Sequence, residues 1–408
     1  PWIAFEWLSE VIYAATYAFA GWNGVVAFAS AMVALAIGLL THFLLRQLST
    51  VLTLLFVIPV MVLLAPHLLA RPHVLTLPVM VTWAAALMHC MDDRRKTPPY
   101  WALPLLVLWA NLHGSVVLAL GLIGPAVLEE LFRKARDEWP RVLMRWLPFA
   151  ALALVACCLT PYGPESLLVP LTTLGIGHSL GWIGEWRPQD FSHFSGFELL
   201  LLVSLFGLSR GVRLPVIRVV VVLGLLHFAL AQVRNADLLA VLAPLYLAAP
   251  LSRQLRTETE GDVVGSVHGL NLIACGVMIA ATSFAQFRDV HPVRNNTPEA
   301  AVAAADLAHA GPLLNDYGFG GYLIFAGIPT FIDGRGELYG GPFIERYNRD
   351  VSLADLDDFL KLLDQYKIEA TLLEPNTPAI ALLDRLPDWR RVYGDDVAVV
   401  HKRLAGSK

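Results

Sequence analysis

Two carboxylates stand in an apolar stretch near the start of the chain, Phe5-Glu6-Trp7-Leu8-Ser9-Glu10. An acid in apolar surroundings is costly to desolvate, and its pKa can rise into the range that suits a general base. The i,i+4 spacing of Glu6 and Glu10 also fits the polar face of an amphipathic helix at a membrane surface. The stretch therefore offers a candidate catalytic acid or base and, as the alternative, a structural helix.

Further polar groups lie in short segments between apolar runs. They are His67, Arg71 and His73; Asn111 and His113; Tyr162 and Glu165; Glu185, Arg187 and Asp190; and Arg234 with Asn235. Arginine suits bidentate binding of a phosphate, and a histidine or acid nearby supplies a general base and orienting groups. Together these residue types are consistent with group transfer from a lipid-linked phosphate.

Each of these residues also has a structural explanation. Arg71 and Arg234 can snorkel at helix ends, and His113 can be a satisfied histidine inside a helical bundle. Glu185 and Arg187 can form a surface ion pair of little energetic value. The functional interpretation therefore depends on whether the groups converge.

The composition is that of a membrane protein: the mean hydropathy is +0.58, 56% of the residues are hydrophobic and 16% are charged. A net charge of -4 gives no indication of a nucleic-acid partner. The four cysteines lie in apolar runs without CxxC or Cys/His spacing, so the sequence predicts neither a disulfide framework nor a zinc site. The chain begins at Pro1 without a methionine or signal peptide, and we expect a preceding first membrane helix.

The apolar runs predict a mostly α fold, a polytopic transmembrane helical bundle over residues 1–286. The expected spans are 22–45, 50–65, 74–91, a broken segment 100–132, 144–160, 197–209, 215–232, 236–251 and 267–286.

The distribution of basic residues predicts the orientation of these spans by the positive-inside rule. Fourteen lysines and arginines fall in one set of connections: Arg46, Arg94, Arg95, Lys96, Arg133, Lys134, Arg136, Arg141, Arg145, Arg210, Arg213, Arg218, Arg253 and Arg256. The opposite connections hold Arg71, Arg187 and Arg234 alone. The first set is therefore expected in the cytoplasm.

The segment 100–132 has basic residues on both sides, so it must enter and leave on the same face. One straight helix of this length would span about 50 Å, more than a bilayer core. The sequence therefore predicts a hairpin of two short helices with a polar break at Asn111-Leu112-His113-Gly114-Ser115.

This topology places the opening carboxylates and the polar segments on one outer face. Ionisable groups at membrane depth mark a site or a pathway by default. The predicted catalytic residues are Glu6, Glu10 and His113; the predicted substrate-binding residues are Arg71, His73, Asn111, Tyr162, Glu185, Arg187, Arg234 and Asn235. The loop 161–196 is expected to act as a lid or binding loop, with Leu167–Leu174 on the membrane surface.

Residues 287–310 are predicted as a linker and helix, and 311–408 as a small α/β domain outside the cytoplasm. Its expected strands are 312–315, 330–333, 370–373, 389–393 and 397–403, and its expected helices are 299–310, 352–366 and 378–386, with 322–325 left as strand or short helix. The second helix is expected to begin at a capping box of Ser352 and Asp355.

Two glycine-rich segments distinguish this domain, Asn315-Asp316-Tyr317-Gly318-Phe319-Gly320-Gly321-Tyr322 and Asp333-Gly334-Arg335-Gly336-Glu337-Leu338-Tyr339-Gly340. Asp333 and Arg335 follow an expected strand, where α/β sheets usually bind ligands. The alternative is turn glycines with a structural Asp333–Arg335 pair. No GxGxxG or Walker pattern is present.

The chain resembles a family of polytopic bacterial membrane proteins, mostly uncharacterised, that looks related to the GT-C class of glycosyltransferases. The resemblance rests on Glu6-Trp7-Leu8, Arg71-Pro72-His73, Trp109 to Gly114, Pro161-Tyr162-Gly163, Glu185-Trp186, Arg234-Asn235 and the two tail segments. It implies a polyprenyl-phosphate sugar donor, an acid in the first outer loop, best matched by Glu6, and often a periplasmic C-terminal domain. The acidic pair flanking one residue in many GT-C members is absent, so a divalent metal stays open.

The sequence therefore predicts a glycosyltransferase of the bacterial inner membrane, with membrane lipid and a polyprenyl-phosphate-linked sugar as partners. Two alternatives remain: a transporter or flippase of a lipid-linked or anionic substrate, and a non-enzymatic envelope assembly or sensor protein. The first would use the broken hairpin as a transport site. The second would act through its C-terminal domain.

Overall fold

The computed structural model describes residues 2–67, 69–93, 97–175, 184–255 and 290–404. Its contacts divide the chain into two compact units, which are described separately below. One holds Ile3–Leu171 and Ile183–Asp289, and the other holds Pro1–Trp2, Thr172–Trp182 and Val290–Lys408. The structure is mostly α-helical with one small sheet.

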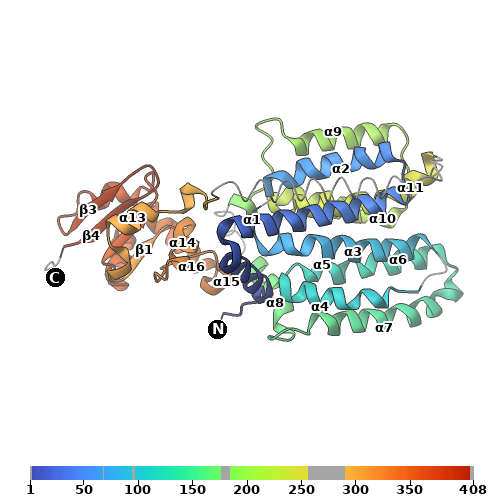
Figure 1. The fold of residues 1–408 in the computed structure, drawn as a ribbon, viewed down its shortest axis with the longest axis horizontal. Helices are drawn as coiled ribbons and strands as arrows, with labels where there is room; N and C mark the ends of the chain where they lie inside the picture. The colour runs from blue at the N-terminus through green and yellow to red at the C-terminus, as the bar shows by residue number, and fades with distance from the viewer. Residues whose placement is uncertain (1, 68, 94–96, 176–183, 256–289, 405–408) are drawn as a thin grey trace. The chain divides into compact units, whose positions relative to one another are not determined.

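Within the described residues, four helices are long and apolar enough to cross a membrane. They are α1 (Trp7–Leu45), α3 (Pro72–Asp92), Arg136–Cys157, which contains α7 (Trp139–Cys157), and Val233–Leu255, which contains α11 (Ala236–Leu255). The shorter apolar helices are α2 (Thr50–Leu64), Tyr100–Leu112 with α4 (Leu103–Leu112), α9 (Gly196–Ser209) and α10 (Val216–Ala231). Figure 1 shows them side by side as one bundle.

Helix α1 begins well before the predicted span at residue 22. It is two helices joined at a kink, where Ala20 and Gly21 leave helical geometry. Gly21 has φ of 59°, a left-handed conformation that glycine adopts without a Cβ clash. The prediction began at 22 because it took only the run after the kink, and residues 7–19 extend the helix back to Glu6.

The predicted hairpin is present as a chain reversal. Helix α4 ends at Leu112, and after the break α5 (Val116–Gly121) and α6 (Ile123–Arg133) run back (Figure 1). Hydrogen bonds join each end to a neighbouring helix: Tyr100 Oη donates to the Arg145 carbonyl of α7 at 3.4 Å, and the Arg133 guanidinium donates to the Met91 carbonyl of α3. The reversal is confirmed, and its position in a bilayer stays a prediction.

Two expectations in this unit need correction. Residues Glu165–Gly175, predicted as part of a long loop, form helix α8. Arg218, counted as a loop residue, lies in the first turn of α10 with a fully buried side chain. It donates to Glu129 at 3.0 Å, Asp92 at 2.7 Å and the Tyr246 carbonyl at 3.1 Å. The expected span 267–286 lies outside the described residues.

The C-terminal unit is built on a four-stranded sheet in the order β1-β2-β4-β3. Strand β1 (Leu313–Asn315) pairs parallel to β2 (Ala370–Leu373), and β4 (Val399–Arg403) pairs antiparallel to β2 and to β3 (Trp389–Gly394). The surrounding helices are α13 (Glu299–Ala304), α14 (Gly320–Phe325), α15 (Gly336–Tyr339), α16 (Gly341–Val351), α17 (Leu356–Gln365) and α18 (Ala379–Leu383).

Three sequence predictions in this unit are wrong. Residues 330–333 are not a strand, because the Asn315 side chain instead bonds the backbone of Phe331 and Ile332. The predicted capping box fails because Ser352 ends the unexpected helix α16, and Asp355 alone caps α17 by accepting from the backbone of 357 and 358. Helix α13 ends at Ala304, before Asp306 adopts a left-handed conformation.

The two glycine-rich tail segments pack directly on each other. Asn315 Oδ1 accepts from Phe331 N at 2.7 Å, and its Nδ2 donates to the Ile332 carbonyl at 2.8 Å. A Cβ placed on Gly320 would lie 2.5 Å from the Asp333 Cβ and 2.8 Å from the Ile332 oxygen. The glycine at 320 is thus required by a close backbone approach.

Substituting this glycine provides a stability test. Gly320→Ala forces the 330–333 segment to move, and we expect a loss of about 1–3 kcal/mol in the free energy of unfolding of the C-terminal unit. Gly321→Ala is the matched control, because nothing lies within 4 Å of its Cβ position in the same helix. Hydrogen exchange of the β1 and β2 amides in the full chain measures both; equal protection would contradict the close-packing argument.

Candidate functional site

Glu6 pairs with His113 at the helix break. Glu6 directly precedes α1, and His113 directly follows α4. The His113 Nε2 lies 3.1 Å from Glu6 Oε1, with side chains 16% and 23% exposed. This contact joins two residues that are separated in the sequence by α1, α2, α3 and α4.

The hydrogen bonds around His113 assign its neutral tautomer. The backbone N–H of Ser115 donates to Nδ1 at 3.0 Å, and Ser115 Oγ lies 2.7 Å from the same nitrogen. Since Nδ1 accepts the backbone N–H, a neutral ring carries its proton on Nε2 and donates it to Glu6. Ser115 Oγ accepts from Trp109 Nε1 at 2.9 Å, which leaves its own proton to be donated to Nδ1.

The break leaves helix-end carbonyls that must find donors in an apolar bundle. Asn111 donates through Nδ2 to the Val107 carbonyl at 2.8 Å and to the Leu159 carbonyl at 3.0 Å. Its Oδ1 accepts from Trp7 Nε1 at 2.8 Å. Ser9 Oγ donates to the Leu112 carbonyl at 2.7 Å. The first turn of α1, directly after Glu6, is therefore fastened to the break at Trp7 and at Ser9.

His73 and Arg71 enter the same region from the start of α3. The rings of His73 and His113 lie 6.3 Å apart between centroids, edge to face. Pro72 occupies the first turn of α3 and Arg71 its N-cap position. Tyr13, on α1, donates its hydroxyl to the Arg71 carbonyl at 3.0 Å. The Arg71–His73 segment is thus placed beside the Glu6–His113 pair.

Glu185 joins two of the predicted phosphate-binding arginines. Its carboxylate forms an ion pair with Arg71, and its Oε1 lies 3.7 Å from Arg234 Nη1. The Arg234 guanidinium also lies 4.5 Å from the centre of the Trp186 ring. Backbone bonds hold this connection: Val233 N donates to the Arg187 carbonyl at 2.9 Å, and Gln189 N donates to the Leu230 carbonyl at 3.0 Å.

The structure gathers only part of the predicted site. Glu6, Arg71, His73, Asn111, His113, Glu185 and Arg234 form one connected cluster. Glu10 is exposed one helical turn beyond Glu6, and Arg187 contributes its backbone to the connection. Asn235 donates to the Phe228 carbonyl at the end of α10 and to Gln232 Oε1. Tyr162 is half-buried, and its backbone N–H donates to Thr160 Oγ1 at 3.3 Å. Glu185, for which a surface pair with Arg187 was the structural alternative, forms ion pairs with Arg71 and Arg234.

Sequence reasoning missed Ser9 and Ser115, which form bonds at the break. It also missed Tyr13, which donates to the Arg71 carbonyl, and Trp186, whose ring lies against the Arg234 guanidinium. A signal was available for Ser115, a hydroxyl two residues from a histidine at a helix break. Trp7 stood in the motif with Glu6, but its indole donor to Asn111 required knowing that the two segments meet.

Asp333 and Arg335 belong to the C-terminal unit, where they form an ion pair with each other. The fully buried Asp333 carboxylate accepts from Arg335 Nε at 2.8 Å, Arg335 Nη2 at 2.6 Å, Tyr339 Oη at 2.6 Å and Thr330 Oγ1 at 3.0 Å. Burial by itself raises the pKa of Asp333, but the hydrogen bonds from Arg335, Tyr339 and Thr330 outweigh it and hold the pKa well below its usual range. This geometry favours the structural interpretation of the pair.

Asp316 and Glu374 lie at the carboxyl edge of the parallel strands β1 and β2, which end at Asn315 and Leu373. Asp316 Oδ1 accepts from Gly318 N at 2.8 Å. Burial, together with the negative charge of Glu374, raises the pKa of Asp316 to about 6.

In the described part of the chain, no group of three or more His, Cys, Asp or Glu side chains could hold a metal ion. No known family model matches the sequence, and no curated protein matches it. The chemistry that the site can perform follows from its own residues. They are the acid Glu6, held by His113, and next to this pair Arg71 and Arg234, which share the Glu185 carboxylate.

Removing the Asn111 amide tests whether the break depends on it. Asn111→Ala leaves the Leu159 carbonyl and the Trp7 indole without their partners, and each buried unsatisfied group costs about 1–3 kcal/mol. We expect a clearly lower midpoint of thermal unfolding in detergent. Asn235→Ala, whose bonds stay within one connection, should lower it much less. Equal midpoints would contradict the role of Asn111.

Asp316 predicts a pH dependence of the C-terminal unit. Its folded pKa of about 6 lies above the unfolded value of about 3.9, so the folded state binds the proton more tightly. Stability is therefore lost as the pH rises from about 4 through about 6. Asp316→Asn should be more stable than wild type by about 1–2 kcal/mol at pH 7.5 and show no gain at pH 4.

Hydrogen exchange of the β1 amides at pH 7.5, corrected for intrinsic exchange, and thermal unfolding at both pH values measure this difference. Asp357→Asn, an exposed acid on α17, is the control. A loss of stability in Asp316→Asn at pH 7.5 would show that the carboxylate stabilises the fold.

Proposed function

We propose that the chain is an integral-membrane glycosyltransferase that moves a sugar from a polyprenyl-phosphate donor to an acceptor hydroxyl at the outer face. The observation that carries the proposal is the Glu6–His113 pair in contact with His73 and, through it, with the Arg71–Glu185–Arg234 chain. A base and an anion-binding group are the two requirements of such a transfer.

Glu6 is the proposed general base. Its carboxylate accepts the proton of the acceptor hydroxyl while the acceptor oxygen forms a bond to the anomeric carbon. His113 Nε2–H holds the Glu6 carboxylate in place, and the bonds from Ser115 to Nδ1 fix that tautomer. An acid positioned by a neutral histidine keeps its basicity, because its partner adds no full charge.

Arg71 and Arg234 are the proposed phosphate ligands. As the bond between the anomeric carbon and the phosphate oxygen breaks, the bonding electrons stay on the phosphate, which leaves as polyprenyl phosphate. The developing negative charge requires fixed positive groups. The Glu185 carboxylate forms ion pairs with both guanidiniums, so a donor phosphate would bind Arg71 and Arg234 in place of this carboxylate.

A transporter of an anionic lipid is the second candidate, and the helix break between α4 and α5 favours it, since interrupted helices often build transport sites. Such a protein would use Arg71 and Arg234 without needing a base. Glu6 therefore separates the two functions.

Glu6→Gln keeps the size of the side chain and a hydrogen-bond acceptor for His113 but removes the base. We expect transfer from a labelled polyprenyl-phosphate sugar in proteoliposomes to fall by about 10²–10⁴-fold. Glu10→Gln, exposed on the next turn of the same helix, should keep wild-type activity.

Thermal unfolding of both variants should match wild type. Full transfer by Glu6→Gln would remove Glu6 from the mechanism. Unchanged movement of the lipid across the bilayer by Glu6→Gln, with no bond cleavage by wild type, would assign the transporter function instead.

A further inference from the structure

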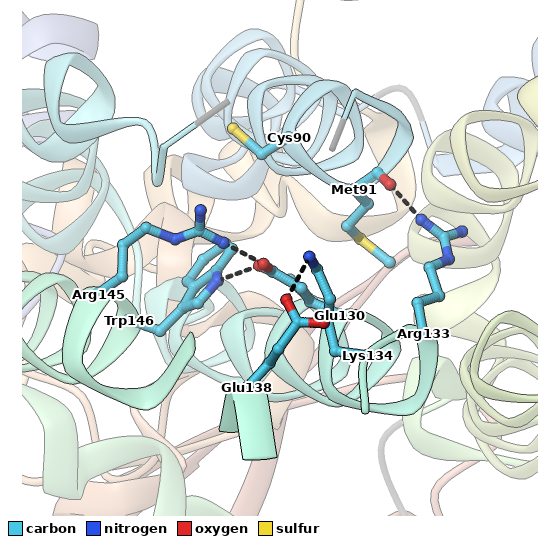
Figure 2. Close-up of a pocket in the computed structure, with 9 residues that line it drawn as sticks. Cys90, Met91, Glu130, Arg133, Lys134, Glu138, Arg145 and Trp146 are labelled. Atoms are coloured by element: carbon cyan, nitrogen blue, oxygen red, sulfur yellow. Dashed lines mark hydrogen bonds and ion pairs between the residues drawn. The ribbon is translucent and has the colours of Figure 1, made fainter. Parts of the chain in front are cut away.

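A second polar cavity lies at the far ends of the same helices. Its volume is about 190 Å³, and it is lined by Cys90, Met91, Ala126, Glu130, Arg133, Lys134, Glu138, Arg145 and Trp146 (Figure 2). These residues come from the end of α3, from α6 and the turn after it, and from α7. Since α3 begins at the Arg71–His73 segment and is 21 residues long, the cavity is about 30 Å from the candidate site.

Each cation of the lining is held by a carboxylate. Arg145 and Trp146 Nε1 both donate to Glu130, the latter at 2.7 Å. Lys134 Nζ donates to Glu138 Oε2 at 2.7 Å. Arg133 donates to Glu129, and Glu129 also accepts from the buried Arg218. Together with the connected groups Glu129, Arg218, Asp92 and Arg253, five cations are set against four carboxylates that they share, which leaves an excess charge of +1.

These side chains retain donors for a ligand. The buried Nε of Arg145 has no hydrogen-bond partner. Lys134 has three donors and uses one in the pair with Glu138. Figure 2 shows the Arg145, Lys134 and Arg133 head groups distributed around the cavity, with Met91 and Cys90 above them. The arrangement offers preorganised donors and an excess of one positive charge over the carboxylates that share these cations.

The surroundings of the cavity are apolar and exposed. Trp101, which follows Tyr100, is 66% exposed. Phe132 precedes Arg133 and is 73% exposed, and Met144 precedes Arg145 and is 67% exposed. A cavity of about 190 Å³ is smaller than the sites of drug-sized ligands, so it suits one head group better than a nucleotide. Basic pockets between membrane helices at the cytoplasmic end commonly bind anionic lipid head groups.

We propose that this cavity binds the phosphodiester head group of an anionic glycerophospholipid, with the acyl chains lying on the apolar side chains beside it. The single negative charge of such a head group, as in phosphatidylglycerol, neutralises the excess charge of the lining. Lys134 and Arg145 donate to the phosphate oxygens, and Arg133 closes the cavity from α6. The site is separate from Glu6 and does not depend on the reaction proposed there.

Two substitutions with opposite expected effects test the proposal on the full chain in detergent. Lys134→Gln removes a phosphate donor and should weaken binding of phosphatidylglycerol about tenfold. Glu138→Gln frees Lys134 and raises the excess charge of the lining, so it should tighten binding by a similar factor. A variant that gains affinity cannot be explained by misfolding. Arg210→Gln, an exposed basic residue of another connection in the predicted cytoplasmic set, is the matched control.

Native mass spectrometry counts the lipids bound by each variant as phosphatidylglycerol or phosphatidylcholine is added. The expected result is one phosphatidylglycerol held in preference to phosphatidylcholine, lost in Lys134→Gln, increased in Glu138→Gln and unchanged in Arg210→Gln. Equal binding of the two lipids, or an equal loss in Arg210→Gln, would show diffuse attraction and overturn the site. Displacement of the lipid by an equal concentration of inorganic phosphate would overturn the assignment to a lipid.

Discussion

The first unit depends on the cost of interrupting a helix among apolar neighbours. When α4 stops at Leu112, backbone groups lose their helical partners, and no water is available inside a packed bundle to replace them. Ser9 Oγ donates to the Leu112 carbonyl, His113 Nδ1 accepts the backbone N–H of Ser115, and Asn111 binds the Trp7 indole and the Leu159 carbonyl. The same residues fix the start of α1, and that fastening is what brings Glu6 to His113. The polar residues that bind the free backbone groups at the break therefore also position the candidate site.

The site combines a rigid pair, Glu6 and His113, with an ion pair that can change partners, Arg71 and Glu185. Glu6 and His113 are largely buried and are held from several directions. Arg71 and Glu185 are 46% and 32% exposed, and their ion pair is of the kind that a competing anion can replace. A catalytic group benefits from fixed geometry, whereas a substrate-binding group must be able to change partners.

Much of the helical framework followed from the length of apolar runs, and the break at Asn111–Ser115 followed from the basic residues on both sides of it. Other features depended on contacts between distant residues. Proximity in sequence offered Arg187 as one alternative partner of Glu185, but the structure pairs Glu185 with Arg71, 114 residues away, and with Arg234. Residues 330–333 have the composition of a strand, yet Asn315 takes their backbone bonds. The glycines and prolines of the segment 161–196 indicated a loop, but its residues Glu165–Gly175 form a helix.

The buried Arg218 has a consequence for how the chain is assembled. A lone arginine or a lone carboxylate is costly in a bilayer core. Glu129 has Arg133 four residues later on α6, so the hairpin carries its own counter-charge as it leaves the ribosome. The bonds of Asp92 go to Arg218 and Arg253, more than a hundred residues later. For a chain that inserts as proposed, the arrival of α10 and α11 therefore brings both of these partners to the carboxylate at the end of α3.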